Sequence, residues 1–165
     1  MSVPPLYWIL AIVAAQRIAE AIYAERNARA LRKQGAIEYA SVQHPFFVAL
    51  HAGWLLAMLF FIPASTPPNW SLVAVFALVQ VARLWVLATL GPRWTTRVLV
   101  LPGVPLVRGG PYRFMRHPNY AIVAIEIAVL PLAFGALWIA AVFTILNGAL
   151  LGWRIRAENA ALSQQ

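Results

Sequence analysis

The sequence predicts an all-α integral membrane protein with about five transmembrane helices, and three observations support this prediction. Of the 165 residues, 62% are hydrophobic and 11% are charged, which is far more apolar than a typical soluble domain. The apolar residues fall into runs of roughly 20, the length that crosses about 30 Å of hydrocarbon. Most lysines and arginines lie between these runs, as membrane topology signals do.

Four apolar blocks define the predicted spans. Three of them have the length of a single helix: residues 6–24, 46–62 and 70–90. The fourth block, residues 120–153, is too long for one span, and Pro131 and Gly135 lie near its middle. Because proline and glycine interrupt helices, this block is predicted to fold as a hairpin of two shorter helices.

The basic residues predict the orientation of the chain. They occur in residues 25–44, in residues 91–117 and near the C-terminus, and five spans place all three segments on one face. The positive-inside rule assigns this face to the cytoplasm, so the N-terminus is expected outside and the C-terminus inside. A four-span alternative would place Arg154 and Arg156 outside. The N-terminus lacks the basic start and cleavage site of a signal peptide and is interpreted as a retained first span.

Composition excludes several kinds of site. The chain has no cysteine, which excludes disulfides, thiolate metal ligands and a thiol nucleophile. Its three histidines lack the spacing of a metal-binding motif, so no metal is expected. No GxGxxG follows a predicted strand, which excludes the soluble dinucleotide-binding fold. The arginines lie between spans, so a nucleic-acid partner is not expected.

Four charged residues lie inside predicted spans, where an unpaired charge is expensive. Arg17 and Glu20 are three residues apart on one helix face and are expected to form an ion pair. Arg83 and Glu126 have no partner on their own helices. They are predicted either to pair with each other across helices or to form the wall of a ligand cavity.

The segment GPYRFMRHPNY, residues 110–120, places two arginines, a histidine and two tyrosines between two apolar segments. Gly109, Gly110 and Pro111 predict a turn, and Pro118 fits the first position of a helix that His117 precedes as the cap. The exposed amides of such a helix start attract an anion.

The predicted hairpin brings a second polar segment back to this helix start. Arg154 and Glu158 are four residues apart, so a helix that continues past the last span places both on one face. We therefore predict that Arg154 and Glu158 lie opposite Tyr112, His117 and Tyr120. The competing interpretation is a membrane-proximal helix that merely neutralises surface charge.

Two motifs, LVRGGPYRFMRHPNY and RIRAENAAL, together with a hairpin of matching length, resemble the isoprenylcysteine carboxyl methyltransferase family of integral membrane enzymes. The resemblance covers residues 101–162. It implies that S-adenosylmethionine is bound and S-adenosylhomocysteine released. The implied cofactor-binding residues are Val104, Pro105, Leu106, Val107, Tyr112, His117, Pro118, Asn119, Tyr120 and Glu158.

The resemblance also implies roles on the last helix. Arg154 corresponds to the arginine that holds the anionic acceptor and orients its oxygen, and Glu158 to the acidic residue of the catalytic site. Two positions depart from the family pattern, which often has Ser where Asn119 stands and a second Glu where Asn159 stands. Because Asn159 removes one charge, Glu158 is expected to act as the single carboxylate.

The first half of the chain, with GAIEYASVQHPFFVALH and ARLWVLATLGPRWTTRVLVLPG, is similar to a bacterial branch of this family that is associated with O-methylation of alkylpyrones. This resemblance implies a lipophilic acceptor, such as an alkylpyrone or a prenylcysteine-like molecule, methylated on a carboxylate or enol oxygen. Together with the orientation that the basic residues predict, it places the expected site on the cytoplasmic side of the bacterial membrane. The acceptor's tail is expected to enter sideways, lined by the last three spans.

The domain organisation follows from these features. Residues 1–165 are expected to form one methyltransferase domain, with a three-span part over residues 1–90 and the cofactor-binding segment, hairpin and C-terminal helix over residues 91–165. Two other functions stay open. A sterol-reductase-like enzyme would use NADPH, and a non-enzymatic membrane protein would bind lipid alone. Neither the acceptor's identity nor the oligomeric state is specified by the sequence.

Overall fold

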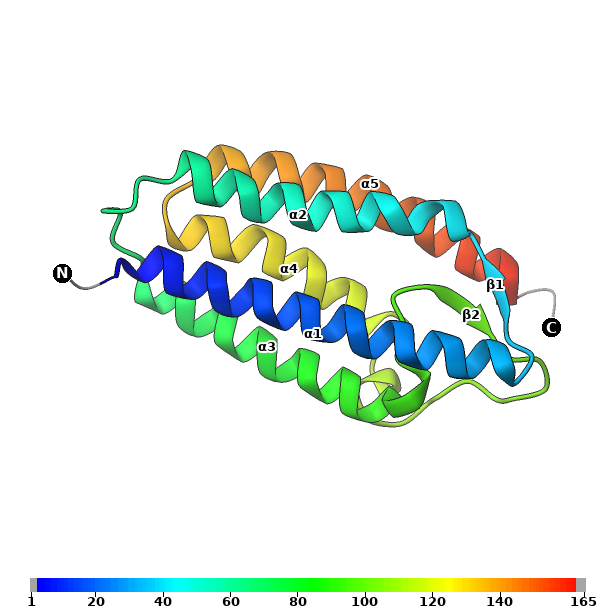
Figure 1. Cartoon of the computed structure of the whole chain (residues 1–165). Coiled ribbons are helices and arrows are strands. Elements are labelled where there is room, and N and C mark those ends of the chain that lie inside the picture. Colours follow the sequence, from blue (N-terminus) through cyan, green and yellow to red (C-terminus); the bar gives the residue numbers. More distant parts are fainter. Residues whose placement is uncertain (1–2, 163–165) are drawn as a thin grey trace.

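Five α-helices account for most of the chain in a computed structural model that describes residues 3–162. They are α1 (Pro5–Lys33), α2 (His44–Phe61), α3 (Trp70–Leu90), α4 (Pro118–Ala133) and α5 (Leu137–Leu162) (Figure 1). Four of these helices are long and apolar enough to cross a membrane, and α4, with 16 residues, is shorter. The predicted all-α membrane fold is therefore confirmed.

Helix α1 is longer than its predicted span. It continues beyond the apolar run as far as Lys33 and comprises 29 residues. The added turns contain alanine, leucine and arginine, which favour helix, and Arg29 pairs with Glu25 one turn earlier at 3.1 Å. The end of the apolar run was therefore a poor guide to the end of the helix.

The predicted hairpin is confirmed. Pro131 lies in the last turn of α4, and Gly135 adopts a φ of +68°, which favours glycine. The amide of Gly135 bonds to the carbonyl of Leu132 and that of Ala136 to the carbonyl of Pro131, both at 3.0 Å. These bonds satisfy carbonyls at the helix end and turn the chain directly into α5.

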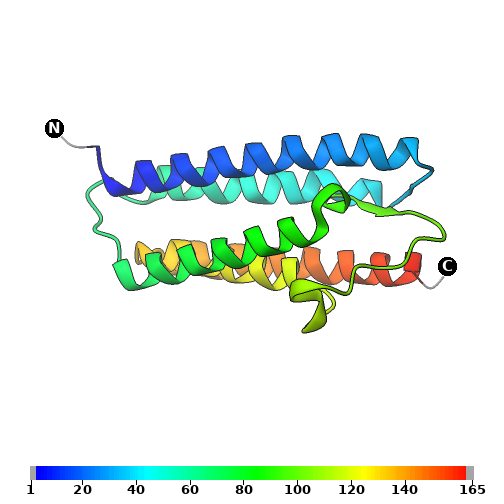
Figure 2. The same ribbon diagram turned by 90° about the horizontal axis from the view of Figure 1, so that it is seen from below.

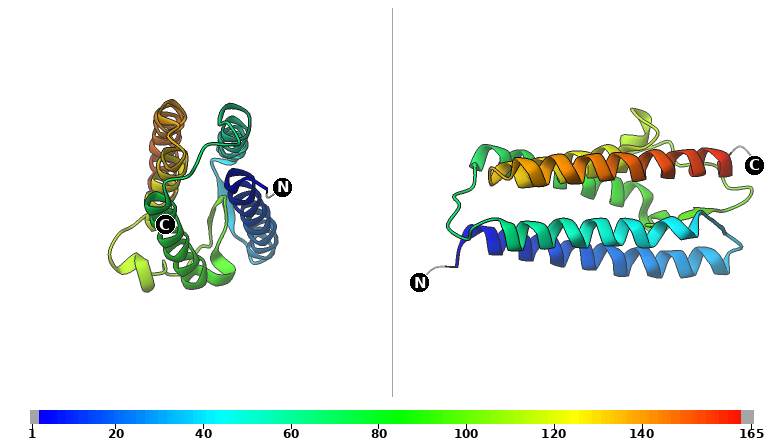
Figure 3. Two further views of the ribbon diagram at one scale, coloured as in Figure 1. Left: turned by 90° about the vertical axis from the view of Figure 1, so that its left-hand side faces the viewer. Right: turned by 90° about the horizontal axis from the view of Figure 1, so that it is seen from above.

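The helices form two layers. Helices α1 and α2 make one layer, and α3, α4 and α5 make the other (Figure 3). An apolar core that includes Leu6, Trp54, Met58, Leu130 and Ile139 joins the layers at the end of the bundle where α1 begins. The opposite end, where α1, α3 and α5 terminate, is called here the loop end. The core does not fill the space between the layers at the loop end.

Two short strands, which the sequence did not predict, connect the layers at the loop end. Strand β1 (Ile37–Tyr39) pairs antiparallel with β2 (Val98–Val100), with Glu38 opposite Leu99. Each strand has three residues, too few for an alternating pattern to be visible in the sequence. Three short 3₁₀ helices, η1 (Ser41–Gln43), η2 (Gly91–Arg93) and η3 (Gly110–Arg113), complete the connections.

The basic residues lie as the sequence predicted. Apart from Arg17 and Arg83 inside the bundle, the lysines and arginines belong to the loop end or to its connecting segments. They therefore share one face of the molecule. Which side of the membrane this face occupies stays a prediction.

Candidate functional site

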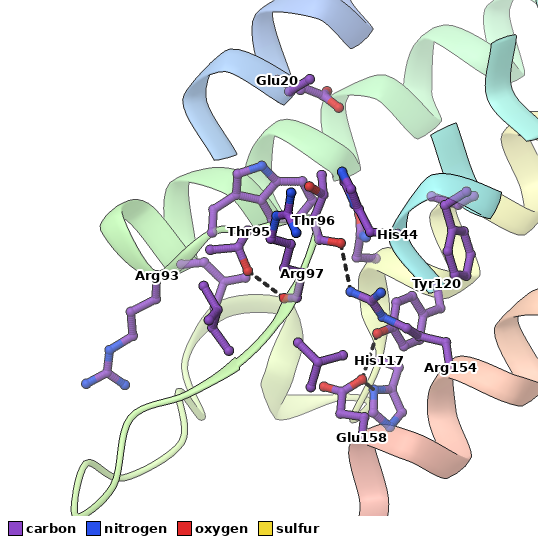
Figure 4. Close-up of a pocket in the computed structure, with 18 of the residues that line it drawn as sticks. Glu20, His44, Arg93, Thr95, Thr96, Arg97, His117, Tyr120, Arg154 and Glu158 are labelled. Carbon is purple, nitrogen blue, oxygen red and sulfur yellow. Dashed lines mark hydrogen bonds and ion pairs between the residues drawn. The ribbon is translucent and has the colours of Figure 1, made fainter. Parts of the chain in front are cut away.

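A cavity of about 1780 Å³ lies between the two layers and extends from the loop end into the bundle. All five helices, β2 and the segment between β2 and η3 contribute lining side chains (Figure 4). Polar groups gather where α4 begins and where α5 returns to the loop end. The cavity therefore contains the region in which the sequence placed the candidate residues.

A tyrosine, a histidine and a glutamate meet at this position. The hydroxyl of Tyr120 donates a hydrogen bond of 2.7 Å to Oε2 of Glu158, and Nδ1 of His117 lies 3.7 Å from the same oxygen. The rings of His117 and Tyr120 stack with centroids 5.2 Å apart. His117 is the residue before α4, and Pro118 is the first helical residue, as predicted. The helix start fixes both rings, and the hairpin returns the glutamate to them.

Arg154 is a buried charge in the cavity that no carboxylate of the described residues neutralises directly. Its side chain is buried, with 5% of the residue exposed. Nη2 donates to the carbonyl of Thr96 at 2.7 Å, and the guanidinium lies 5.5 Å from the centroid of the Phe47 ring. Among residues 3–162, no carboxylate lies within ion-pairing distance of Arg154.

None of the five acidic side chains of the protein is a partner of Arg154, because each is engaged elsewhere. Glu20 and Glu126 pair with arginines inside the bundle, and Glu25 and Glu38 pair with arginines at the loop end. Glu158 is engaged by Tyr120 and His117. A buried, unpaired guanidinium is costly, so this part of the cavity is suited to an anionic ligand.

A short ion network holds the peptide that contacts Arg154. Glu38 of β1 accepts hydrogen bonds from Arg32 at 2.7 Å and from Arg97 at 2.8 Å. Burial raises the pKa of Glu38, but these bonds and the two positive charges outweigh it and lower the pKa below the ordinary value. Glu38 therefore stays ionised near neutral pH. Through Arg97 it fixes the segment just before β2, to which Thr96 also belongs.

The predicted segment of residues 104–107 and Tyr112 form another wall of the cavity. The carbonyl of Pro105 accepts a hydrogen bond of 2.8 Å from Arg93. Burial and the charge of Glu158 raise the pKa of Tyr112 to about 12, so its phenol stays protonated and able to donate.

Of the predicted residues, all but Pro118 line the cavity: Val104, Pro105, Leu106, Val107, Tyr112, His117, Asn119, Tyr120, Arg154 and Glu158. Pro118 instead faces a small groove on the outer surface of α3 and α4. Its position shapes the helix start and not the cavity wall. The side-chain oxygen of Asn119 is buried and has no hydrogen-bond partner among the described residues, so it can accept one from a ligand.

The first half of the chain contributes residues that the sequence analysis did not select. Phe47 and His44 come from the start of α2, and Thr96 contributes only its backbone carbonyl. One signal in the sequence could have pointed to His44 and Phe47: QHPFF at residues 43–47 resembles RHPNY at residues 116–120. Both histidine–proline pairs lie at helix starts, and both histidines line the same cavity.

A network of two arginines and two glutamates lies deeper in the bundle. Arg83 donates to both oxygens of Glu20 at 2.6–2.9 Å and to Glu126 at 3.0 Å. Arg17 lies 3.2 Å from Glu20 and 3.0 Å from Glu126. Both predicted ion pairs are confirmed, and they join α1 to α3 and α4 in one neutral cluster. Three members, Arg17, Glu20 and Arg83, also line the cavity and form its inner wall.

Comparison with known proteins adds three findings. A sequence model described as the isoprenylcysteine carboxyl methyltransferase (ICMT) family matches residues 72–164. A protein of Bacillus subtilis (strain 168), named Uncharacterized protein YpbQ, is 40% identical over 164 residues, covering 96% of this chain and 98% of the relative. No solved structure matches the chain.

Proposed function

The chain belongs to the isoprenylcysteine carboxyl methyltransferase family of membrane methyltransferases, and from this premise we propose that it transfers a methyl group from S-adenosylmethionine to an anionic oxygen of a lipophilic acceptor. The observation that supports this proposal best is Arg154, a buried cation without a carboxylate partner in residues 3–162. A carboxylate or an ionised enol supplies the missing charge. A planar guanidinium can also hold such a group with two parallel hydrogen bonds.

The residues around Arg154 fit the donor as well. S-adenosylmethionine supplies a methyl group on a positively charged sulfur and also has an ammonium, a carboxylate and an adenosine. Glu158 provides one carboxylate in the cavity, and its Oε1 atom makes no hydrogen bond within residues 3–162. We propose that Glu158 holds the ammonium, that His117, Asn119 and Tyr120 hold polar parts of the donor, and that residues 104–107 and Tyr112 border the adenosine.

The chemistry needs few catalytic groups. The acceptor oxygen forms a bond to the methyl carbon, and the electron pair of the breaking carbon–sulfur bond stays on sulfur. The positive charge of the donor and the negative charge of the acceptor disappear together, and no proton is transferred. Positioning the two reactants is therefore the main task of the protein. The methylated product has lost its charge, so its attraction to Arg154 falls and release is favoured.

The cavity lining also suggests the path of the acceptor's tail. The sequence predicts that the last three spans line it. Among the helices, α1 and α2 contribute more apolar lining residues than the last three do, and they include Ala14, Ile18, Ala21, Val48, Ala52 and Leu55. Ile18 and Val48 are 61% and 56% exposed on the outer surface of the bundle. We propose that the tail leaves the cavity between α1 and α2 and continues into the bilayer.

Donor binding tests the function directly. We expect the purified protein in detergent to bind S-adenosylmethionine in a calorimetric titration, and Glu158→Gln to weaken binding roughly ten-fold or more, since a hydrogen bond to a charged group is worth about 1.5–3 kcal/mol. Glu25→Gln is the matched control, because it removes a carboxylate that also borders the cavity but is paired with Arg29 and Arg97. Equal losses in both variants would contradict the role of Glu158.

The same titration separates the alternatives. A sterol-reductase-like enzyme would bind NADPH and not S-adenosylmethionine. A non-enzymatic lipid-binding protein would bind neither, and its properties would be insensitive to His117→Ala. Formation of S-adenosylhomocysteine in the presence of long-chain carboxylic or enolic acceptors would establish the transfer itself.

The proposed path of the acceptor's tail is tested by placing a large side chain between α1 and α2. Ala21→Trp should raise KM for a long-chain acceptor several-fold while the affinity for S-adenosylmethionine stays the same, because the indole occupies the gap between α1 and α2. Ala19→Trp adds the same side chain to an exposed position of α1 outside the cavity lining. An unchanged KM in Ala21→Trp would mean that the tail takes another path.

A further inference from the structure

The segment of residues 110–116, called here the η3 lobe, projects sideways from the bundle near the loop end (Figure 2). It exposes two large apolar side chains, with Phe114 75% and Met115 48% accessible. Exposed apolar surface of this kind on a projecting segment is characteristic of an interaction site. In a membrane protein, its position relative to the bilayer decides what the partner is.

A groove of about 250 Å³ separates the η3 lobe from the outer faces of α3 and α4. Its walls are apolar and include Phe114 and Met115 on one side and Trp85 and Ile125 on the other. The rings of Trp85 and Phe114 lie 6.4 Å apart. Trp85 and Ile125 are 50% and 44% exposed, so the groove is open to the surroundings of the bundle.

The position of Trp85 on α3 predicts that the groove lies at the depth where lipid chains meet their headgroups. Trp85 is five residues before the end of α3 at Leu90, which is about 7–8 Å along the helix axis. Helix α3 is a candidate membrane span, so its outer face contacts lipid. Tryptophan is also enriched at this interfacial depth. These features together predict that acyl chains occupy the groove.

Two arginines of the η3 lobe determine which lipid fits. Arg113 and Arg116 are exposed, and among residues 3–162 no carboxylate lies within ion-pairing distance of either. Both also line the main cavity, and they flank the groove residues Phe114 and Met115 in the chain. Unpaired arginines next to an apolar groove match a phosphate group attached to acyl chains, and a net negative headgroup strengthens that attraction.

From this combination we propose that the η3 lobe binds an anionic phospholipid, with an acyl chain in the groove and the headgroup at Arg113 and Arg116. Tyr112 belongs to the same lobe, and His117 follows it directly. A bound lipid would therefore hold two proposed donor-binding side chains in place. This last consequence rests on the proposed function, whereas the lipid site itself does not.

Lipid binding is measured first, without any donor. Native mass spectrometry of the detergent-solubilised protein, with phosphatidylglycerol and phosphatidylcholine of the same acyl chains, should show preferential retention of phosphatidylglycerol. Arg113→Gln/Arg116→Gln should reduce this preference by between about five-fold and about thirty-fold, since each arginine near an anionic lipid surface contributes a factor of about five. Phe114→Ser/Met115→Ser should reduce the retention of both lipids.

The control is Arg26→Gln/Lys33→Gln, which removes two exposed charges from α1 at the same end of the bundle. It should leave the preference unchanged. Equal retention of the two lipids by the wild type, an equal loss in this control, or displacement of phosphatidylglycerol by millimolar inorganic phosphate would overturn the proposal.

The coupling to the donor is measured separately. In nanodiscs, phosphatidylglycerol should strengthen S-adenosylmethionine binding by the wild type. Phe114→Ser/Met115→Ser, which changes the groove and not the cavity lining, should remove this gain while matching the wild type in pure phosphatidylcholine. A weaker affinity of this variant in phosphatidylcholine would show an effect on the donor site that needs no anionic lipid and would refute the coupling. Absence of donor binding in every lipid, with the lipid preference intact, would refute the proposed function and leave the lipid site standing.

Discussion

Arg154→Ala should lower kcat/KM for an anionic acceptor by roughly thirty-fold to several thousand-fold. The reason is the burial of the guanidinium beside Thr96 and Phe47, where solvent cannot replace the lost interaction. Truncating one partner of a buried, hydrogen-bonded charge pair costs about 2–5 kcal/mol. The measurement is the rate of S-adenosylhomocysteine formation against acceptor concentration.

Two comparisons make the Arg154 result specific. Arg156→Ala removes an exposed arginine two residues later on α5 and should leave the rate unchanged. Arg154→Lys retains the charge but loses the planar fork, so it should recover only part of the activity. Donor affinity, measured in parallel, should be nearly constant across the series. A large loss of donor binding in Arg154→Ala would assign the arginine to the donor or to the fold.

Arg83→Met should lower the free energy of unfolding by about 3–5 kcal/mol, the usual cost of removing one partner from a buried ion pair. Arg83 donates to Glu20 and Glu126, so its loss leaves two buried carboxylates with Arg17 as their single cation. The measurement is the unfolding midpoint in detergent as denaturing surfactant is added.

The contribution of charge can be separated from that of packing. Arg83→Met/Glu20→Gln restores a neutral cluster, and it should be less destabilised than the sum of the single variants. Arg29→Met breaks an exposed ion pair with Glu25 on α1 and should have little effect on the free energy of unfolding. If Arg83→Met matched Arg29→Met in stability, the network would be unimportant for the fold.

Part of the candidate site was predictable because two local signals converge on it. Pro131 and Gly135 end α4 and turn the chain into α5, and this hairpin returns Glu158 to the helix start at His117. Interruption of helices by proline and glycine is a strong and local effect. Because a hairpin links the two motifs, they lie close together in space although they are far apart in the sequence.

The remaining part of the site had no such signal. Thr96 acts through its backbone carbonyl, which every residue possesses, and Phe47 resembles any apolar residue near a helix start. The pairing of β1 with β2 depends on tertiary contacts over three residues and leaves no periodic pattern. The helical course of residues 25–33 was missed because hydropathy describes contact with lipid and not the continuity of a helix.

The two layers of helices also correspond to two consecutive parts of the sequence. The family match covers residues 72–164, which form α3, α4 and α5, whereas α1 and α2 lie outside it. The wall formed by α3, α4 and α5 is thus the part of the cavity that the family match covers. If the α1/α2 wall holds the acceptor as proposed, exchanging residues 3–61 with those of a relative should change the preferred acceptor and leave the proposed donor-binding wall intact.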